Sequence, residues 1–198
     1  MRRIFFKGEM MNILDLRFSK EKEKSISLWP GHLFKEYRCD PSMFAPVHRL
    51  PVGLHIGDRW FLLTEEIREY PRGEDTVKSF TFLMKETEKS KIRSTRPDVV
   101  QKDVKIGKEI AAVEIQNEKK TLYKDGKEFC QIYVTKGIRF IFKEGTLTFR
   151  KPVYFSDFLN IEDGSPLCKE WEEKDRLPEE WEDRFHAVTE VENIYFDK

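Results

Sequence analysis

Strict alternation of apolar and polar residues is the clearest pattern in the chain, and it is concentrated between residues 108 and 150. The apolar positions are Ala111, Val113 and Ile115, then Cys130, Ile132 and Val134, then Ile138, Phe140 and Phe142, then Leu147 and Phe149. A period of two is typical of strands that bury one face. The runs are separated by Asp125-Gly126, Lys136-Gly137 and Glu144-Gly145, so this region predicts an antiparallel meander.

A similar but less regular pattern lies earlier in the chain. Residues 52–63 predict two short strands around Gly57-Asp58, and residues 77–86 predict another strand. Thr64 and the acidic residues after it predict a capped helical turn that ends near Tyr70-Pro71. Residues 19–25 alternate in charge and indicate a solvated turn.

The character of the sequence changes after residue 161. Ser165-Pro166 and Leu177-Pro178 are helix-start signals, so short helices are expected over residues 167–174 and 179–185. Partial alternation over residues 188–196 predicts a last strand. Together these patterns predict an α+β fold, in which a predominantly antiparallel sheet, with its meander at about residues 108–150, is covered by short C-terminal helices.

Length and composition favour one domain spanning residues 1–198. Hydrophobic residues make up 39% of the chain and aromatic residues 13%, which is enough for a core. A globule of this mass should bury about 70% of its extended surface. Residues 86–108 are polar, which indicates an exposed loop and a possible boundary between subdomains, and residues 161–198 form an acidic segment.

The cysteines and the N-terminus predict a cytoplasmic protein. Cys39, Cys130 and Cys168 are odd in number and form no Cys-x-x-Cys pair, so neither a disulfide framework nor a zinc ribbon is expected. The apolar run at residues 4–6 is shorter than that of a signal peptide. No apolar stretch approaches the length of a membrane-spanning helix.

Residues 7–9, Lys-Gly-Glu, precede Met10-Met11 directly. A purine-rich ribosome-binding site of the bacterial kind encodes such residues when it is translated. One hypothesis is therefore that translation starts at Met10 or Met11, and the alternative is an ordinary N-terminal extension that begins at Met1.

Charge is balanced over the chain but not along it. Lys and Arg number 36, as do Asp and Glu, so the formal net charge is zero. Residues 161–198 hold thirteen acids against five bases, which leaves an excess of eight acids there and of eight bases in residues 1–160. The acidic segment either docks on the basic body, forms a free face for a basic protein partner, or tunes the binding of nucleic acid by that body.

Motifs for catalysis are missing. The sequence has no phosphate-binding glycine loop, no Gly-x-Ser-x-Gly elbow and no His-Glu-x-x-His zinc helix. His48 and His55 are the only histidines close in sequence, and Asp58 or Glu65 would complete a metal or acid–base set with them. A Cys39 nucleophile is a weaker alternative. Separately satisfied histidines explain the pattern as well, so no cofactor, metal or catalytic residue is assigned.

These observations favour a non-catalytic, cytoplasmic protein-binding domain of the immunity-protein or regulatory type. We expect a protein partner, of basic character where the acidic segment makes the contact, and no membrane. We expect the contact at an acidic aromatic face formed by Trp171, Glu179, Glu180, Trp181 and Glu182.

Two alternatives remain. One is a nucleic-acid-binding protein that uses the basic body, with Tyr123 and Tyr133 as the aromatics outside the core and a basic loop around residues 85–96. The other is a hydrolase or metal enzyme that uses His48 and His55.

Overall fold

A computed structural model describes residues 4–6, 9–41, 47–72, 75–151, 158–164 and 186–198, and for residues 4–6, 9–12, 66–72 and 75–81 it describes the backbone alone. The described residues form twelve strands and two short helical elements. In chain order these are β1 (Ile4–Phe6), β2 (Glu9–Leu16), α1 (Lys20–Ile26), β3 (Leu33–Cys39), β4 (Val47–Arg49), β5 (Val52–Ile56), β6 (Arg59–Arg72), β7 (Asp75–Thr87), the 3-10 turn η1 (Lys89–Lys91), β8 (Lys102–Lys124), β9 (Lys127–Phe142), β10 (Thr146–Arg150), β11 (Phe158–Asp163) and β12 (His186–Asp197).

The fold is nearly all-β, so the predicted α+β class is wrong. Among the described residues α1 is the one α-helix, and no described helix is long and apolar enough to cross a membrane. The helices expected over 167–174 and 179–185 lie outside the described residues. The described part of the acidic segment holds β11 and β12, and β12 confirms the predicted last strand instead of a helical cover.

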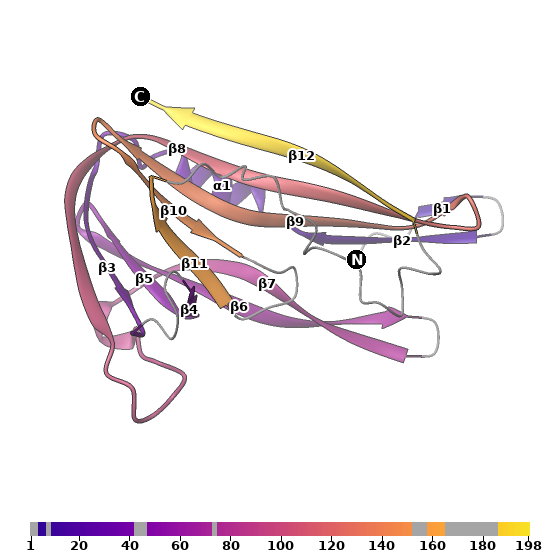
Figure 1. Cartoon of the computed structure of the whole chain (residues 1–198), viewed down its shortest axis with the longest axis horizontal. Helices are drawn as coiled ribbons and strands as arrows, with labels where there is room; N and C mark the ends of the chain where they lie inside the picture. The colour runs from indigo at the N-terminus through magenta and orange to yellow at the C-terminus, as the bar shows by residue number, and fades with distance from the viewer. Residues whose placement is uncertain (1–3, 7–8, 42–46, 73–74, 152–157, 165–185) are drawn as a thin grey trace.

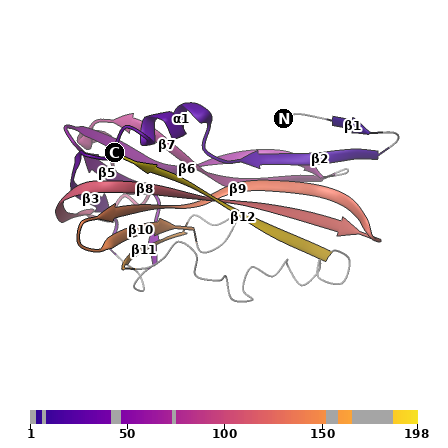
Figure 2. The same cartoon turned by 90° about the horizontal axis from the view of Figure 1, so that it is seen from above.

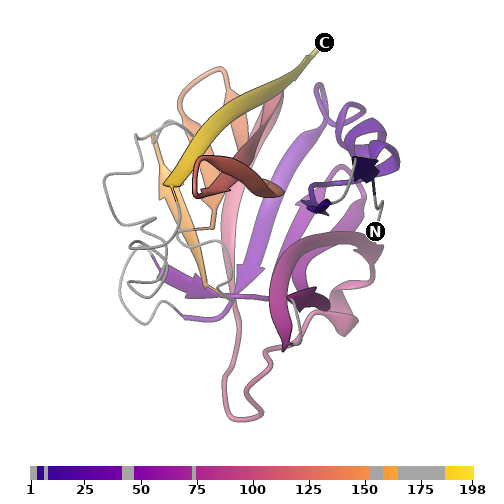
Figure 3. The same ribbon diagram turned by 90° about the vertical axis from the view of Figure 1, so that its right-hand side faces the viewer.

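The strands follow the order β4-β11-β10-β9-β8-β3-β5-β6-β7, with β12 beside β8 and the β1–β2 hairpin beside β9 (Figure 1). The pairings are antiparallel, which confirms the predicted antiparallel sheet, except that β2 runs parallel to β9. Seen along the long axis, the strands form a curved wall around the interior, with α1 at one side (Figure 3).

Strand β8 joins the two halves of this wall. Its first residues pair with β3, whereas residues from Ile110 onward pair with β9. The register with β3 shifts at Ile106-Gly107, and Gly107 has a φ of +63°, which glycine adopts without the steric cost of a side chain. One strand therefore belongs to both halves.

The meander is confirmed at two of its three predicted turns. Residues Asp125-Gly126 connect β8 to β9, and Gly145 lies between β9 and β10 with a φ of +86°. The turn predicted at Lys136-Gly137 is wrong, because β9 continues through it. Thr135 pairs with Asn117 and Gly137 with the preceding residue of β8, so Lys136 is the extra residue of a β-bulge. Its carbonyl accepts a hydrogen bond from Lys151 N at 2.8 Å.

Two further local predictions are wrong. The helical turn expected after Thr64 is instead a continuation of β6, which stays in register with β7 from Trp60–Thr87 to Arg72–Asp75. That ladder satisfies the backbone more completely than one capped turn. Residues 19–25 are not a solvated turn, because α1 begins after Ser19, whose hydroxyl accepts from Lys22 N at 3.3 Å.

Aromatic rings from both halves of the wall fill the core. Phe140 of β9 lies 4.7 Å from the ring of Phe34 on β3 and 5.8 Å from that of Phe149 on β10. Trp29, just after α1, packs against Phe140 at 5.8 Å and against Phe61 of β6 at 4.9 Å. The short helix therefore closes the same core that the strands enclose.

Phe140 is the central ring of this cluster, so Phe140→Ala is expected to lower the free energy of unfolding by about 3–5 kcal/mol. Phe129→Ala is the matched control, because Phe129 lies on the same strand and is 37% exposed. We expect it to cost about 1 kcal/mol or less. Denaturant titration of both variants measures the difference, and equal losses would contradict the assigned core.

Candidate functional site

Strand β12 lies on the outside of the sheet, beside the second part of β8 (Figures 1 and 2). The two strands pair in one continuous antiparallel register from His186–Tyr123 to Asp197–Ala112. Ile194 and Phe196 pack against the core. Among the described strands, β8 is the only one that pairs with β12. The other edge of β12 pairs with no strand among the described residues, and we call it the open edge.

This open edge is long and exposed. β12 has twelve residues, and Val188, Val191 and Tyr195 are 40%, 48% and 56% exposed. In an antiparallel strand alternate residues direct their N–H and C=O groups away from the paired neighbour. Such groups are a template for another strand, and proteins usually protect them with charged side chains, above all lysine, with proline or with a bulge. The charged side chains of β12 are acidic, apart from His186. The sequence of β12 contains no Lys, Pro or Gly, and its register with β8 has no bulge.

Acidic residues of this C-terminal strand pair with bases of the body. Glu190 lies 2.8 Å from Lys119 of β8, and Glu192 lies 3.9 Å from Arg17. After the strand, Lys198 Nζ donates to Glu109 at 2.9 Å. The described end of the acidic segment is thus docked on the body, as the first interpretation of the charge separation expects.

The residues predicted to bind a partner, Trp171, Glu179, Glu180, Trp181 and Glu182, lie outside the described residues. The open edge that follows them was not singled out from the sequence. Partial alternation of residues 188–196 predicted a strand, but the alternation does not show which neighbour a strand pairs with.

The two histidines considered for catalysis contact different groups. His48 on β4 is buried, and its Nδ1 lies 3.2 Å from the carbonyl oxygen of Asp40. His55 on β5 stacks on Trp60 with ring centroids 4.6 Å apart, and its Nδ1 lies 3.7 Å from Glu36 Oε1. Within the described parts of the chain, no group of three or more His, Cys, Asp or Glu side chains is arranged to hold a metal ion.

Burial also changes the acidity of these groups. It lowers the pKa of His48 and is the main cause of the lowered pKa of His55. Burial raises the pKa of the Cys39 thiol to about 11, so this sulfur stays protonated near neutral pH. A protonated thiol is a poor nucleophile. The geometry therefore gives no support to the Cys39 alternative.

A cluster of ion pairs that the sequence did not predict lies between β3, β8 and η1. Glu36 is buried and accepts hydrogen bonds from Lys105 and, at 3.1 Å, from Lys89. Lys89 also lies 2.9 Å from Asp103, which Arg38 binds through two hydrogen bonds of 2.6 and 2.8 Å. These bonds lower the pKa of Glu36, chiefly through Lys105, and that of Asp103, chiefly through Arg38.

The same region holds a strap, which we define as residues 88–101 between β7 and β8. Asp40 is fully buried and binds the strap through Ser94 Oγ at 2.7 Å and Gln101 Nε2 at 3.0 Å. Ile92 is buried beside Trp60. The loop predicted over residues 86–108 is thus anchored to the sheet, and its last residues, from Lys102, belong to β8.

Several of the side chains considered for nucleic acid contact other residues of the protein. Tyr133 lies under the Arg17 guanidinium at 4.6 Å and donates its hydroxyl proton to Gln131 at 2.8 Å. In the strap, Lys89 belongs to the ion-pair cluster and Arg96 lies 3.7 Å from Asp40. Each of these side chains is thus engaged by another residue of the protein.

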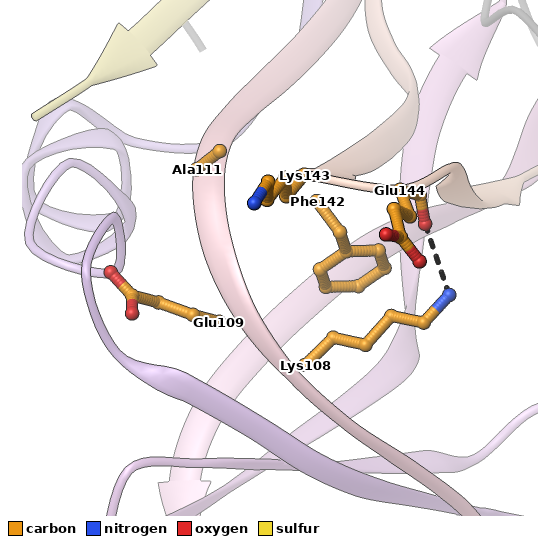
Figure 4. A pocket seen from close by; sticks show the side chains of 6 residues that line it. All are labelled: Lys108, Glu109, Ala111, Phe142, Lys143 and Glu144. Carbon is orange, nitrogen blue, oxygen red and sulfur yellow. Dashed lines mark hydrogen bonds between the residues drawn. The ribbon is translucent and has the colours of Figure 1, made fainter.

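A shallow hollow of about 350 Å³ lies beside the β9–β10 turn (Figure 4). Lys108 extends across it along the face of Phe142, with Nζ 5.7 Å from the ring centroid, and donates to the Glu144 carbonyl at 3.0 Å. Glu109 points to the opposite side of β8 (Figure 4). The hollow therefore lacks convergent polar groups directed at one point, which a small-molecule site needs.

In comparisons with protein families, with curated proteins and with solved structures, no match to this chain was found.

The buried ionisable groups predict a pH-dependent stability in two steps. The lowered pKa of His48 means that the unfolded chain binds more protons, so stability is present above the ordinary pKa of 6.5 and falls as the pH drops below it. The lowered pKa of Glu36 gives a second loss below its ordinary value of 4.5.

Denaturant titrations over a range of pH separate the two groups. His48→Gln is expected to flatten the pH dependence just below pH 6.5 while leaving the acidic limb intact. Glu36→Gln should flatten the limb below pH 4.5 and lower the stability at neutral pH, because Lys89 and Lys105 lose a buried carboxylate. Unchanged slopes in both variants would contradict these assignments.

Proposed function

We propose that this protein is a non-catalytic, cytoplasmic protein-binding domain, and that the open edge of β12 receives an extended segment of its partner as an added strand. The observation that carries the proposal is this exposed edge of twelve residues, which has one described neighbour, β8. Strand addition derives affinity from main-chain hydrogen bonds and specificity from the side chains on each side of the new pair.

A comparison with the opposite end of the sheet supports this choice. β7 also pairs with one described strand, β6, but its sequence carries Lys78 and Lys85. Lysine on an edge strand discourages pairing with other chains. The edge strand β4 has only three residues. Of these three edges, only β12 is long and free of lysine.

The acidic aromatic residues Trp171, Glu179, Glu180, Trp181 and Glu182 belong to the same segment as β12. We include them in the proposal as a second contact region for a basic partner. Aromatic anchors and complementary charge are typical of specific protein interfaces. Simultaneous charge reversal at Glu179, Glu180 and Glu182 is expected to weaken capture of a partner that the β12 edge selects.

Selection of random peptides that bind the full-length protein, followed by amide hydrogen exchange of the complexes, tests whether the open edge of β12 is the binding site. Selected peptides are expected to slow exchange of β12 amides, because an added strand occupies their outward N–H groups. Ligands that leave exchange in β12 unchanged and protect another surface would contradict the proposal.

Proline at two neighbouring positions sharpens this test. Of Val191 and Glu192, one directs its N–H toward β8 and the other directs it outward. Proline at the position whose N–H points outward is expected to abolish peptide binding and to keep the thermal stability. Proline at the position whose N–H points toward β8 is expected to lower the thermal stability, because it removes a hydrogen bond of the β8–β12 pair. Val191→Thr is the matched control, since it keeps the N–H and a β-branched side chain. Binding that survives both prolines would exclude strand addition at this site.

A further inference from the structure

Building on the proposed function, we infer that the segment added to β12 is a basic segment of the partner, with Lys or Arg at alternate positions. The inference depends on where Glu190 and Glu192 stand in the strand. They are two residues apart, so their side chains lie on one face of β12.

Charge disfavours several of the pairings that β12 could make with β12 of a second copy. A twofold pair centred on Val191 sets Glu190 of one copy opposite Glu192 of the other, twice. A pair centred on Glu190 or on Glu192 sets that glutamate opposite itself. Like charges directly opposite each other destabilise an antiparallel pair. The registers centred on residues 190, 191 and 192 are therefore disfavoured for a second copy. A register centred on Asn193 sets no glutamate opposite another, and the sedimentation experiment tests for it.

Both glutamates have room for a further cation. The side chain of Glu190 is 60% exposed and that of Glu192 is 65% exposed. Their partners Lys119 and Arg17 come from elements on the inner side, β8 and the end of β2. A carboxylate accepts several hydrogen bonds through its two oxygens. Lys or Arg side chains of an added strand would thus approach from the open side without displacing these pairs.

The opposite face of β12 defines the rest of the pattern. Val191 and Tyr195 lie on that face, because they alternate with the glutamates, and about half of each side chain is exposed. Branched and aromatic side chains pair well across strands. The partner segment should therefore alternate basic residues with β-branched or aromatic ones.

Three synthetic peptides of about ten residues test this. Valine occupies alternate positions in each, and the other positions hold Lys, Gln or Glu. Titration calorimetry with the full-length protein is expected to show the Lys peptide binding about tenfold more tightly than the Gln peptide, as two cross-strand charge pairs allow, and the Glu peptide binding least. Higher salt should reduce the preference.

The double variant Glu190→Lys and Glu192→Lys is expected to reverse the order of the Lys and Glu peptides. Glu86→Lys with Glu88→Lys is the matched control, because it makes the same change of charge at two exposed positions with the same spacing, at the end of β7 and in the strap. That control should keep the order of the unmodified protein.

The outcomes separate this inference from the proposed function. Equal binding of the Lys and Gln peptides, with β12 amides protected, would overturn the basic partner and leave strand addition standing. If sedimentation shows that the protein is a dimer, and the proline at the outward-facing position of β12 abolishes that dimer, the occupant of the edge is a second copy and the basic partner is overturned. Failure of all peptides to protect β12 in a monomeric protein would remove the proposed function itself.

Discussion

The sharing of β8 between both halves of the curved sheet is the constraint on which the rest of the structure depends. Its first residues are bound to β3 and its later residues to β9, and the bulge at Ile106-Gly107 lets one strand turn between the two. Because strands of both halves pair with β8, their inner faces converge, and the aromatic rings of β3, β9 and β10 contact one another. The later part of β8 is also the only described strand that pairs with β12.

Two of the buried acids in this protein hold separate elements together. Glu36 and Asp40, at the middle and just past the end of β3, are almost fully buried, and each is bound by residues that follow β7. Removing one partner of such a pair leaves an uncompensated charge, which costs far more than the pair contributes. The strap is therefore held to the sheet by groups that tolerate little change. The acids of β12 contrast with them, because their exposed side chains remain available to solvent.

Much of the strand content follows from local sequence, whereas the pairing does not. Alternation identified β8, β9, β10 and β12, since period two reports which face of a strand is buried. It failed at Lys136-Gly137, because a Lys-Gly step is as suitable for a bulge as for a turn, and only the register with β8 decides between them. It failed at Thr64 because the hairpin partner of β6 overrode the local capping signal.

The open edge and the ion-pair cluster depend on residues far apart in the chain. Glu36 meets Lys105 across 69 positions, and Lys119 meets Glu190 across 71. No local pattern in the sequence points to such contacts. The Ser19 cap of α1, in contrast, is a local signal that alternating charge concealed.

The parallel pairing of β2 with β9 has a consequence for how the chain folds. Phe18 N, just past β2, donates to Thr135 Oγ1 across 117 positions in the sequence. Closing a loop of that length costs entropy before any contact repays it, and rates of folding fall as the sequence separation of contacts grows. The hairpins β6–β7 and β8–β9 need only local closure. The chain is thus expected to form these hairpins first and to add its N-terminal strand late, which leaves the outer edge of β9 uncovered for part of the folding reaction.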